Sequence, residues 1–364
     1  MKRLLLAGGG HGHINVLKKL IQTPLQNTEI LLITDFEKQY YSGMLPGFIE
    51  GLYAEEEICF NVRKLCEAVK VEYIEKKIIE IDADRKKVIT NRGEYGFDYI
   101  SMNLGASSRE IFEIEETTMS YVKPIANIVD LVRRIEAKYQ ELRAASQSKN
   151  PIRVGIIGSG AAGIEIALAL ASRYPSIFIE ILGREKEILA KFNTSAREKI
   201  TKIMRRKGIH VRSGEEVLIL NQEGLMTGNS HQSYDFYIIS NGYTGLPIRF
   251  SGYEVTKENY LLVDDDLRAN DFSIAMGDMI SLKKDERNLK AGVFAIRQAP
   301  ILFDNLKRIL KEEQSLRSYR AAKNYLQIIN TGNKTAVLNY GNHSFQGRIA
   351  WLLKDFIDRA YMKV

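Results

Sequence analysis

One arrangement of residues occurs twice in this chain and limits what it can fold into. Each copy begins with an apolar stretch, continues through a cluster of glycines into an apolar segment of helical length, and ends in a second apolar stretch. The first copy covers residues 3–33 and the second covers residues 153–182. Because strand, turn, helix and strand in this order make the unit of a parallel sheet, the copies predict an α/β protein with two such sheets.

A second repeated phrase follows each copy. In residues 98–105 and again in residues 235–242, an aspartate precedes a short apolar run that leads to an asparagine and a glycine. Duplication of one domain explains this pairing better than chance does. We therefore expect two related nucleotide-binding domains in the 364-residue chain, whose length suits two or three domains.

The glycine clusters match what a diphosphate requires. Backbone N–H groups at the start of a helix bind a diphosphate, and side chains in the turn would block its approach. The second copy has glycine at each position of this fingerprint, Gly158, Gly160 and Gly163, directly after a predicted strand. The pattern predicts Rossmann-like, three-layer dinucleotide-binding domains.

The first copy departs from the fingerprint at its third position, where His13 replaces glycine. Gly8 and Gly10 still permit the tight turn and the close approach of a ligand, so this copy is also predicted to bind a dinucleotide. His11 lies in the same turn. The chain has only 5 histidines and no carboxylate cluster near this turn, so we expect no metal site.

The residue at the end of each second strand predicts how the adenosine is held. Asp35 follows the strand of the first copy and is a candidate to bind a ribose, with an exposed loop aspartate as the alternative. The strand of the second copy ends at Gly183, where NAD enzymes often have an acid, and Arg184 follows. An arginine without the acid admits a 2′-phosphate, so NADH and NADPH are both allowed; a solvated arginine is the alternative.

Composition excludes several classes of protein. No apolar run reaches the roughly 18 residues that cross a bilayer, and the apolar start leads into glycines instead of a signal peptide, so we expect a cytoplasmic protein. The net charge is +7, and residues 283–323 hold 11 Lys or Arg against 5 Asp or Glu. No helix-turn-helix, zinc-finger or aromatic RNA-binding pattern accompanies this charge, so we expect no nucleic-acid partner.

Four segments carry a resemblance to a known family: residues 6–13, 41–47, 158–163 and 274–278. They resemble the FAD-dependent pyridine nucleotide-disulfide oxidoreductase superfamily, and within it the branch of type II NADH dehydrogenase-like proteins. The histidine-bearing glycine turn followed by Tyr-Ser-Gly-Met-Leu-Pro-Gly is similar to the subgroup sometimes fused to selenophosphate synthetase. The resemblance implies FAD at the first copy and NADH or NADPH at the second.

The resemblance also implies roles for single residues. Asp278, beside Gly277, would bind the ribityl chain of FAD. Glu165 would lie near the stacked nicotinamide and flavin rings, with ordinary complementarity to the helix dipole as the alternative. Lys290 would add positive charge at a helix start against the flavin, and Gln298 would face the electron acceptor. The remaining implied contacts are Gly8, Gly10, His11, Gly12, Asp35, Ile78 and Gly105 for FAD, and Gly158, Gly160, Gly163, Arg184 and Gly242 for NAD(P).

The cysteines distinguish this chain from two groups that it resembles. Disulfide reductases of the superfamily carry a paired redox-cysteine motif, and sulfide:quinone reductases carry separated cysteines near the flavin. Cys59 and Cys66 resemble neither arrangement. We therefore predict an oxidoreductase whose flavin takes a hydride from NAD(P)H and passes electrons directly to a quinone-like acceptor. The alternative is a flavin- and nucleotide-binding sensor or interaction protein with slow turnover.

The last segment predicts an amphipathic helix. Apolar residues recur at helical spacing along one stripe, Ile349, Leu352, Leu353, Phe356, Ile357, Ala360 and Tyr361. Charged residues, among them Lys354 and Asp358, take the other face. Packing of the stripe on the protein's own core or in a homodimer is the favoured interpretation, and contact of residues 349–361 with the cytoplasmic face of a membrane is the alternative.

These signals also predict domain boundaries. The FAD domain is expected to be discontinuous, covering residues 1–118 and 246–322, with the NAD(P) domain inserted at residues 119–245. Residues 323–364 are expected to form a C-terminal segment that carries the amphipathic helix.

Overall fold

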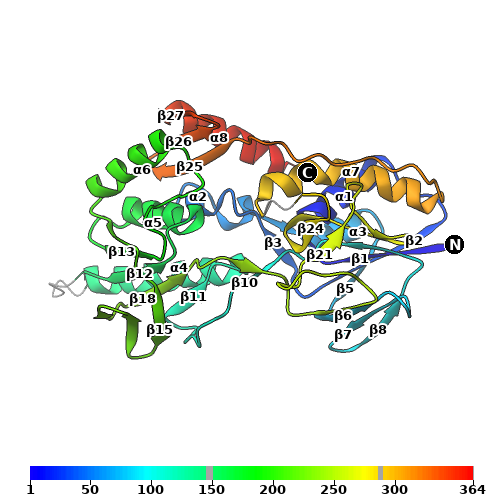
Figure 1. Ribbon diagram of the computed structural model, residues 1–364, viewed down its shortest axis with the longest axis horizontal. Coiled ribbons are helices and arrows are strands. Elements are labelled where there is room, and N and C mark those ends of the chain that lie inside the picture. The colour runs from blue at the N-terminus through cyan, green and yellow to red at the C-terminus, as the bar shows by residue number, and fades with distance from the viewer. Residues whose placement is uncertain (145–150, 286–289, 364) are drawn as a thin grey trace.

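A computed structural model describes residues 1–144, 151–285 and 290–363, so residues 286–289 of the basic stretch lie outside it. It contains two mainly parallel sheets, one in each half of the molecule (Figure 1). Helices cover one face of each sheet, and further strands or a helix cover the other. The predicted α/β class with two Rossmann-like layered domains is confirmed.

The first sheet contains six strands, and all neighbours are parallel except the edge pair β22–β23. Their order is β22 (Arg268–Asn270), β23 (Ser273–Ala275), β9 (Tyr99–Met102), β1 (Lys2–Ala7), β2 (Thr28–Thr34) and β5 (Glu72–Glu75). Strand β1 is apolar and buried on both faces from residue 4 onward, as expected for the centre of a parallel sheet.

The second sheet contains five parallel strands. Their order is β11 (Met119–Tyr121), β18 (Phe236–Ile239), β12 (Arg153–Ile157), β13 (Phe178–Gly183) and β14 (His210–Ser213). The first sheet thus draws its strands from two stretches of the chain, and the second sheet from the stretch between them.

The helices bury their apolar stripes on these sheets and on each other. The longer ones are α1 (His11–Gln22), α4 (Ile125–Ala144), α5 (Ala161–Arg173), α6 (Thr194–Arg206), α7 (Gly292–Leu310) and α8 (Arg348–Met362). Helix α1 contacts α7 and the short α3 (Val62–Ala68) in the first domain. Helix α2 (Leu45–Ile49) belongs to the first part of the chain but packs against α5 of the second domain, and so joins the two halves.

Smaller sheets complete the structure. They are β20 (Arg249–Ser251) with β6 (Ile78–Asp82), β7 (Lys87–Thr90) and β8 (Gly93–Gly96); β15 (Val217–Asn221) with β16 (Gly224–Thr227) and β17 (His231–Gln232); β25 (Gln327–Gly332) with β26 (Thr335–Tyr340) and β27 (His343–Gly347); β3 (Lys38–Tyr40) with β4 (Cys59–Asn61); β10 (Ser107–Ser108) with β19 (Tyr243–Thr244); and β21 (Leu261–Val263) with β24 (Ile280–Leu282).

The repeated aspartates make the same bond in both domains. The Asp98 carboxylate accepts a hydrogen bond from the backbone N–H of Arg3 at 2.7 Å. The Asp235 carboxylate accepts one from the backbone N–H of Arg153 at 2.8 Å. Each bond fixes the start of a central strand against its neighbour, which supports the predicted duplication.

The C-terminal helix is amphipathic, but its orientation is the reverse of the one expected for packing on the protein's own core. The apolar side chains of Ile349 and Phe356 are 70% and 71% exposed, and Leu352, Leu353 and Ile357 are exposed as well. The stripe therefore does not pack on the protein's own core, except at its end, where Tyr361 is partly buried. As Figure 1 shows, α8 lies across one side of the molecule and reaches from the second domain to the first.

Polar contacts on the inner face explain this orientation of α8. Asp358 is buried, and its carboxylate accepts hydrogen bonds from the Tyr41 hydroxyl at 3.0 Å and from the Lys354 ammonium at 2.7 Å. Asp355 accepts a hydrogen bond from the Tyr53 hydroxyl at 2.6 Å. These partners hold the charged face inward, so the apolar face is left outside. No helix in the described ranges is long and apolar enough to cross a membrane.

We predict that Asp358→Ala lowers the free energy of unfolding by about 3 kcal/mol, because it leaves the Lys354 ammonium buried without its carboxylate. Denaturant unfolding measures this change. Asp130→Ala is the control, since Asp130 pairs with Arg133 on an exposed surface and its loss should cost less than about 1 kcal/mol. Equal losses in the two variants would show that the Asp358 pair does not hold α8.

Candidate functional site

The first glycine turn connects β1 to α1 and is shaped by close backbone contacts. Gly8 has a φ of +93°, and a Cβ placed on it would lie 2.6 Å from the carbonyl oxygen of Asn103. A Cβ on Gly10 would also collide with Asn103. Only glycine fits these two positions, so the backbone of the turn lies bare at the start of α1.

Asn103 joins the ends of three strands at this turn. Its side-chain oxygen accepts a hydrogen bond from Gly12 N–H at 2.7 Å, and its side-chain nitrogen donates to the Met276 carbonyl at 3.1 Å. Gly277 has a φ of +80°, and a Cβ on it would lie 2.8 Å from the Asn103 amide nitrogen. Asn103 was not among the predicted site residues, although its place in the repeated phrase was a usable signal.

His13 takes a structural role in the turn. Its ring is fully buried, with Nδ1 2.5 Å from the Gly8 carbonyl oxygen and Nε2 2.8 Å from the Ser101 hydroxyl. Burial lowers the pKa of His13 to about 4, so the ring is neutral at physiological pH. Nδ1 therefore donates to Gly8, and Nε2 accepts from Ser101. The ring thus stabilises the first glycine turn from the position where the fingerprint has its third glycine.

The second glycine turn repeats this geometry between β12 and α5. Gly158 has a φ of +116°, and a Cβ on it would collide with the carbonyl of Ser240. A Cβ on Gly163 would collide with the carbonyl of Gly158. Gly160 and Gly242 face open space, with nothing within 4 Å of an added Cβ.

Three helices point uncapped N-termini into these regions. Helices α1, α5 and α7 begin after Gly10, Gly160 and Ala291, and none has a side-chain cap or an acidic residue in its first turn. The first N–H groups of a helix need partners, and they favour negative charge. Thr34, at the end of β2, has a buried hydroxyl oxygen without a hydrogen-bond partner in the described structure. Two bare glycine turns and three uncapped helices fit the diphosphates and rings of two dinucleotides.

Asp278 lies in the short helix η2 (Gly277–Met279) and forms an ion pair that the sequence did not predict. Its carboxylate is 2.5 Å from the Lys123 ammonium, and each side chain is only 20% exposed. Burial lowers the pKa of Lys123, but Asp278 and Tyr243 more than offset this effect, so the pKa is raised. The Lys123 ammonium also lies 4.2 Å from the centroid of the Tyr243 ring. Lys123 comes from a distant segment, and no motif marked it.

Gln298 and Lys290 lie beside the same turn. The Gln298 side chain is buried, and its oxygen accepts a hydrogen bond from Gly277 N–H at 2.8 Å. Its contact with an electron acceptor stays a prediction. The Lys290 ammonium donates to the Ile280 carbonyl and lies 3.9 Å from the Tyr260 ring centroid. Burial lowers the pKa of Lys290 to about 8.

Glu165 belongs to α5, and its side chain faces β25 and α8. Its carboxylate accepts a hydrogen bond from Asn330 N–H at 2.8 Å. Burial raises the pKa of Glu165 to about 7, although the nearby Lys354 ammonium opposes the shift. A carboxyl group that titrates near neutral pH can hold or release a proton under physiological conditions.

The other predicted contacts lie at or just beyond the ends of strands. Asp35 is exposed directly after β2, and Ile78 is buried at the start of β6. Gly105 has a φ of +82° and faces open space. Arg184 is exposed after β13 and pairs only with Glu185 among the described residues, at 3.3 Å. Their binding roles stay predictions.

Helix α8 reaches the first glycine turn through aromatic side chains. The Tyr361 hydroxyl lies 2.9 Å from His11 Nδ1, and the ring centroids of Tyr361 and Tyr41 are 4.7 Å apart. The Lys18 ammonium donates to the Tyr361 carbonyl at 3.0 Å. Burial lowers the pKa of His11 to about 4. The described residues contain no group of three or more His, Cys, Asp or Glu that could hold a metal ion.

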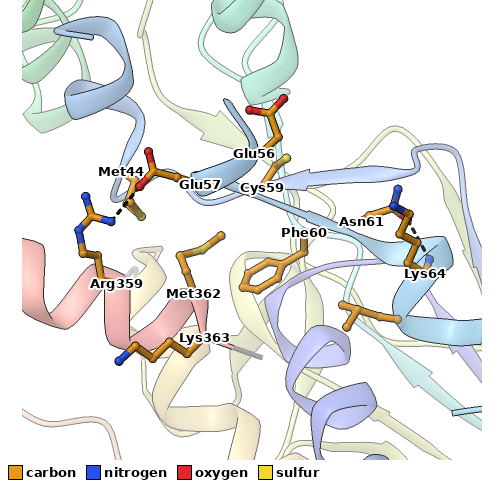
Figure 2. A pocket seen from close by; sticks show the side chains of 11 residues that line it. Met44, Glu56, Glu57, Cys59, Phe60, Asn61, Lys64, Arg359, Met362 and Lys363 are labelled. Atoms are coloured by element: carbon orange, nitrogen blue, oxygen red, sulfur yellow. Dashed lines mark hydrogen bonds and ion pairs between the residues drawn. The ribbon is translucent and has the colours of Figure 1, made fainter. Parts of the chain in front are cut away.

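A pocket of about 510 Å³ opens between the end of α8 and β4 (Figure 2). Met44, Phe60 and Met362 supply apolar walls, and the ion pair between Glu57 and Arg359 lies at 2.8 Å on one side. The Phe60 ring centroid is 5.9 Å from that of Tyr361, so the pocket adjoins the aromatic contacts of the first turn.

Both thiols are poor nucleophiles. Cys59 lines this pocket and is half-buried, and burial raises its pKa. Cys66 is buried, and burial raises its pKa to about 12. Because the thiolate is the reactive form, neither side chain is prepared for thiol chemistry at neutral pH.

Comparison with known proteins extends these observations. A family model described as pyridine nucleotide-disulphide oxidoreductase matches residues 2–299. A type II NADH:quinone oxidoreductase of Staphylococcus aureus (strain bovine RF122 / ET3-1) is 24% identical over 339 residues, which cover 86% of this chain and 84% of that protein.

Solved structures confirm the fold. NDH2 from Plasmodium falciparum in complex with NADH has a TM-score of 0.79 at 14% identity, covering 99% of this chain and 96% of that chain. The sulfide:quinone oxidoreductase from the hyperthermophilic bacterium Aquifex aeolicus has a TM-score of 0.78 at 15% identity, covering 99% of this chain and 90% of that chain.

We predict that His13→Ala weakens FAD binding and lowers the free energy of unfolding by about 3 kcal/mol, since it leaves a cavity and removes the partners of Gly8 and Ser101. Flavin titration and denaturant unfolding measure the two effects. His231→Ala, an exposed histidine, should change neither. Unchanged flavin affinity in the His13 variant would contradict the supporting role.

We predict that Glu165→Gln removes part of the pH dependence of stability. Between pH 4.5 and about 7 the unfolded chain has lost the Glu165 proton while the folded chain keeps it. The free energy of unfolding therefore falls as pH rises through this window and is level on both sides of it. Denaturant unfolding at a series of pH values should show a shallower fall in the variant. Parallel curves would exclude a raised pKa at Glu165.

Proposed function

Because this chain belongs to the pyridine nucleotide-disulphide oxidoreductase family, we propose that it is an FAD-dependent NAD(P)H oxidoreductase that reduces a quinone-like acceptor. When both cofactors are bound, the nicotinamide supplies a hydride to the flavin, which passes electrons on. The residues of the chain would orient the two cofactors, place positive charge beside the flavin and leave a path for the acceptor.

The residues around the two turns divide this work. Gly8, Gly10 and the start of α1 would hold the FAD diphosphate, and Asp278, which pairs with Lys123, would bind sugar hydroxyls. The uncapped start of α7, with Lys290 two residues before it, would stabilise negative charge on a bound flavin. The second turn and the start of α5 hold the NAD(P)H diphosphate.

The position of α8 is the observation that carries the choice of acceptor. Its inner face touches the first turn through Tyr361 and His11, and its outer face is apolar and exposed. A lipophilic acceptor that leaves a membrane along this outer face arrives beside the flavin domain. The raised pKa values of Cys59 and Cys66 support direct transfer of electrons from the flavin to the acceptor, because neither thiol offers a thiolate that could relay them.

We further propose that residues 349–361 contact a membrane surface peripherally. An exposed apolar stripe of this extent is costly in water and is typical of a surface that becomes covered. A homodimer through the same stripe is the competing arrangement, and the experiment on α8 below distinguishes them. The similarity to the subgroup sometimes fused to selenophosphate synthetase stays a prediction.

The first test is anaerobic stopped-flow of the FAD-loaded protein. We expect NADH or NADPH to bleach the flavin absorbance, and a soluble quinone to restore it rapidly. Bleaching without recovery by quinone would uphold the oxidoreductase and exclude this acceptor. Bound flavin that neither nucleotide reduces would overturn the proposal in favour of a slow sensor.

The second test addresses α8. We predict that Phe356→Glu lowers binding to lipid vesicles about tenfold, the effect of withdrawing one aromatic side chain from an apolar phase. Turnover with a vesicle-embedded quinone should fall in parallel, and turnover with a water-soluble quinone should not change. Ile111→Glu, at a residue 60% exposed outside α8, is the matched control. A change in sedimentation from dimer to monomer without a loss of vesicle binding would favour the homodimer.

A further inference from the structure

The end of β13 lacks the group that usually recognises a free ribose. The strand ends at Gly183, where an acid would bind the adenosine 2′-hydroxyl in an NAD site. Gly183 is buried, and a Cβ on it would lie 2.8 Å from the Cβ of Ser159, inside the second glycine turn. An acidic side chain here would displace that turn. The close packing of Gly183 against the Ser159 side chain therefore disfavours an acid at this position.

The loop after Gly183 is held firmly at this edge of the sheet. Leu189 N–H donates to the Ser159 carbonyl at 3.0 Å, which ties the loop to the glycine turn. Gly214 N–H donates to the Glu185 carbonyl, also at 3.0 Å, which ties the loop to the end of β14. The backbone of Arg184 is thus fixed near the place where the adenosine ribose of a bound dinucleotide would lie.

The Arg184 guanidinium is available to a ligand. Its side chain is 67% exposed and, in the part of the chain that the structure describes, pairs only with the adjacent Glu185, whose side chain is 61% exposed. An ion pair between two such exposed neighbours contributes little, so the guanidinium can turn toward a phosphate at small cost. The nearby Arg212 is not available in this way, because it pairs with Glu215 at the end of β14.

A basic groove continues from this loop along α6. Its volume is about 950 Å³, and it is lined by five cations, Lys186, Arg197, Lys202, Arg205 and Arg206, against two acids, Glu187 and Glu198. Glu187 pairs with Arg197, so one of the acids is already neutralised. Lys186, two residues after Arg184, brings this positive charge to the end of β13.

We infer that the second dinucleotide site selects NADPH over NADH, with Arg184 binding the adenosine 2′-phosphate and Lys186 adding positive charge. This inference rests on the proposed function, because it places NAD(P)H at this site. A phosphate monoester carries about 1.5 to 2 negative charges at pH 7, and a guanidinium binds it through two parallel hydrogen bonds. NADH offers only a hydroxyl at that position.

The test compares the binding of NADP⁺ and NAD⁺ by calorimetry, which needs no electron transfer. We expect the FAD-loaded protein to bind NADP⁺ at least about tenfold more tightly, as a charge-assisted pair predicts. Arg184→Ala should weaken NADP⁺ binding about tenfold and change NAD⁺ binding by less than about twofold. Lys202→Ala, a cation farther along the groove, should change neither. Added salt should weaken NADP⁺ binding more than NAD⁺ binding.

Other outcomes overturn the inference without touching the proposed function. The unaltered protein could bind NADP⁺ and NAD⁺ with equal affinity, or Arg184→Ala could weaken the binding of both nucleotides equally. Either result would show that Arg184 is a solvated surface residue, or that Glu185 binds the ribose of NADH. Rapid flavin reduction by NADH would still support the oxidoreductase. Conversely, tight Arg184-dependent binding of NADP⁺ without flavin reduction would support the inference while the proposed function fails.

Discussion

Both proposed dinucleotide sites depend on bare backbone at the carboxyl end of a central parallel strand. Gly8 and Gly158 adopt positive φ values because the chain must turn sharply and pass within contact distance of a neighbouring strand. Neither α1 nor α5 is capped by the side chain of the residue before it, and in α1 Asn103 accepts a hydrogen bond from Gly12 N–H. The Asp98 and Asp235 bonds at the opposite ends of the sheets fix the register that makes the turns possible.

Helix α8 links the first domain to the surface of the molecule. Its charged face is turned inward because Tyr41, Tyr53 and Lys354 satisfy Asp355 and Asp358 there. Its apolar face is exposed for the same reason. The residues that anchor the helix are therefore the ones that create the exposed apolar surface. Only the end of α8, at Tyr361, reaches the first glycine turn.

Local patterns predicted the parts of this structure that local chemistry determines. The two glycine turns, their strands and the α/β class follow from the spacing of Gly8, Gly10, Gly158, Gly160 and Gly163, and the structure confirms that fold. The period of the apolar residues predicted α8 as a helix. Periodicity alone does not say which face is covered, since that depends on the partners that tertiary contacts supply.

The contacts between distant segments were beyond prediction from one sequence. Lys123 meets Asp278 across 155 positions, and Tyr361 meets His11 across 350. No local pattern marks such partners, because their proximity arises only when the two domains and α8 pack together. Asn103 is an intermediate case. Its repeat in the second domain was visible, but its bonds to Gly12 and Met276 required the assembled sheet.

The third position of the two fingerprints gives a more general lesson about such motifs. In the second turn Gly163 leaves room for the Gly158 carbonyl, and in the first turn His13 donates a hydrogen bond to the equivalent carbonyl of Gly8. The shared requirement concerns that carbonyl, which must be either given space or given a donor. A sequence pattern that demands three glycines would overlook the first domain, whereas a pattern that also accepts histidine at the third position would find it.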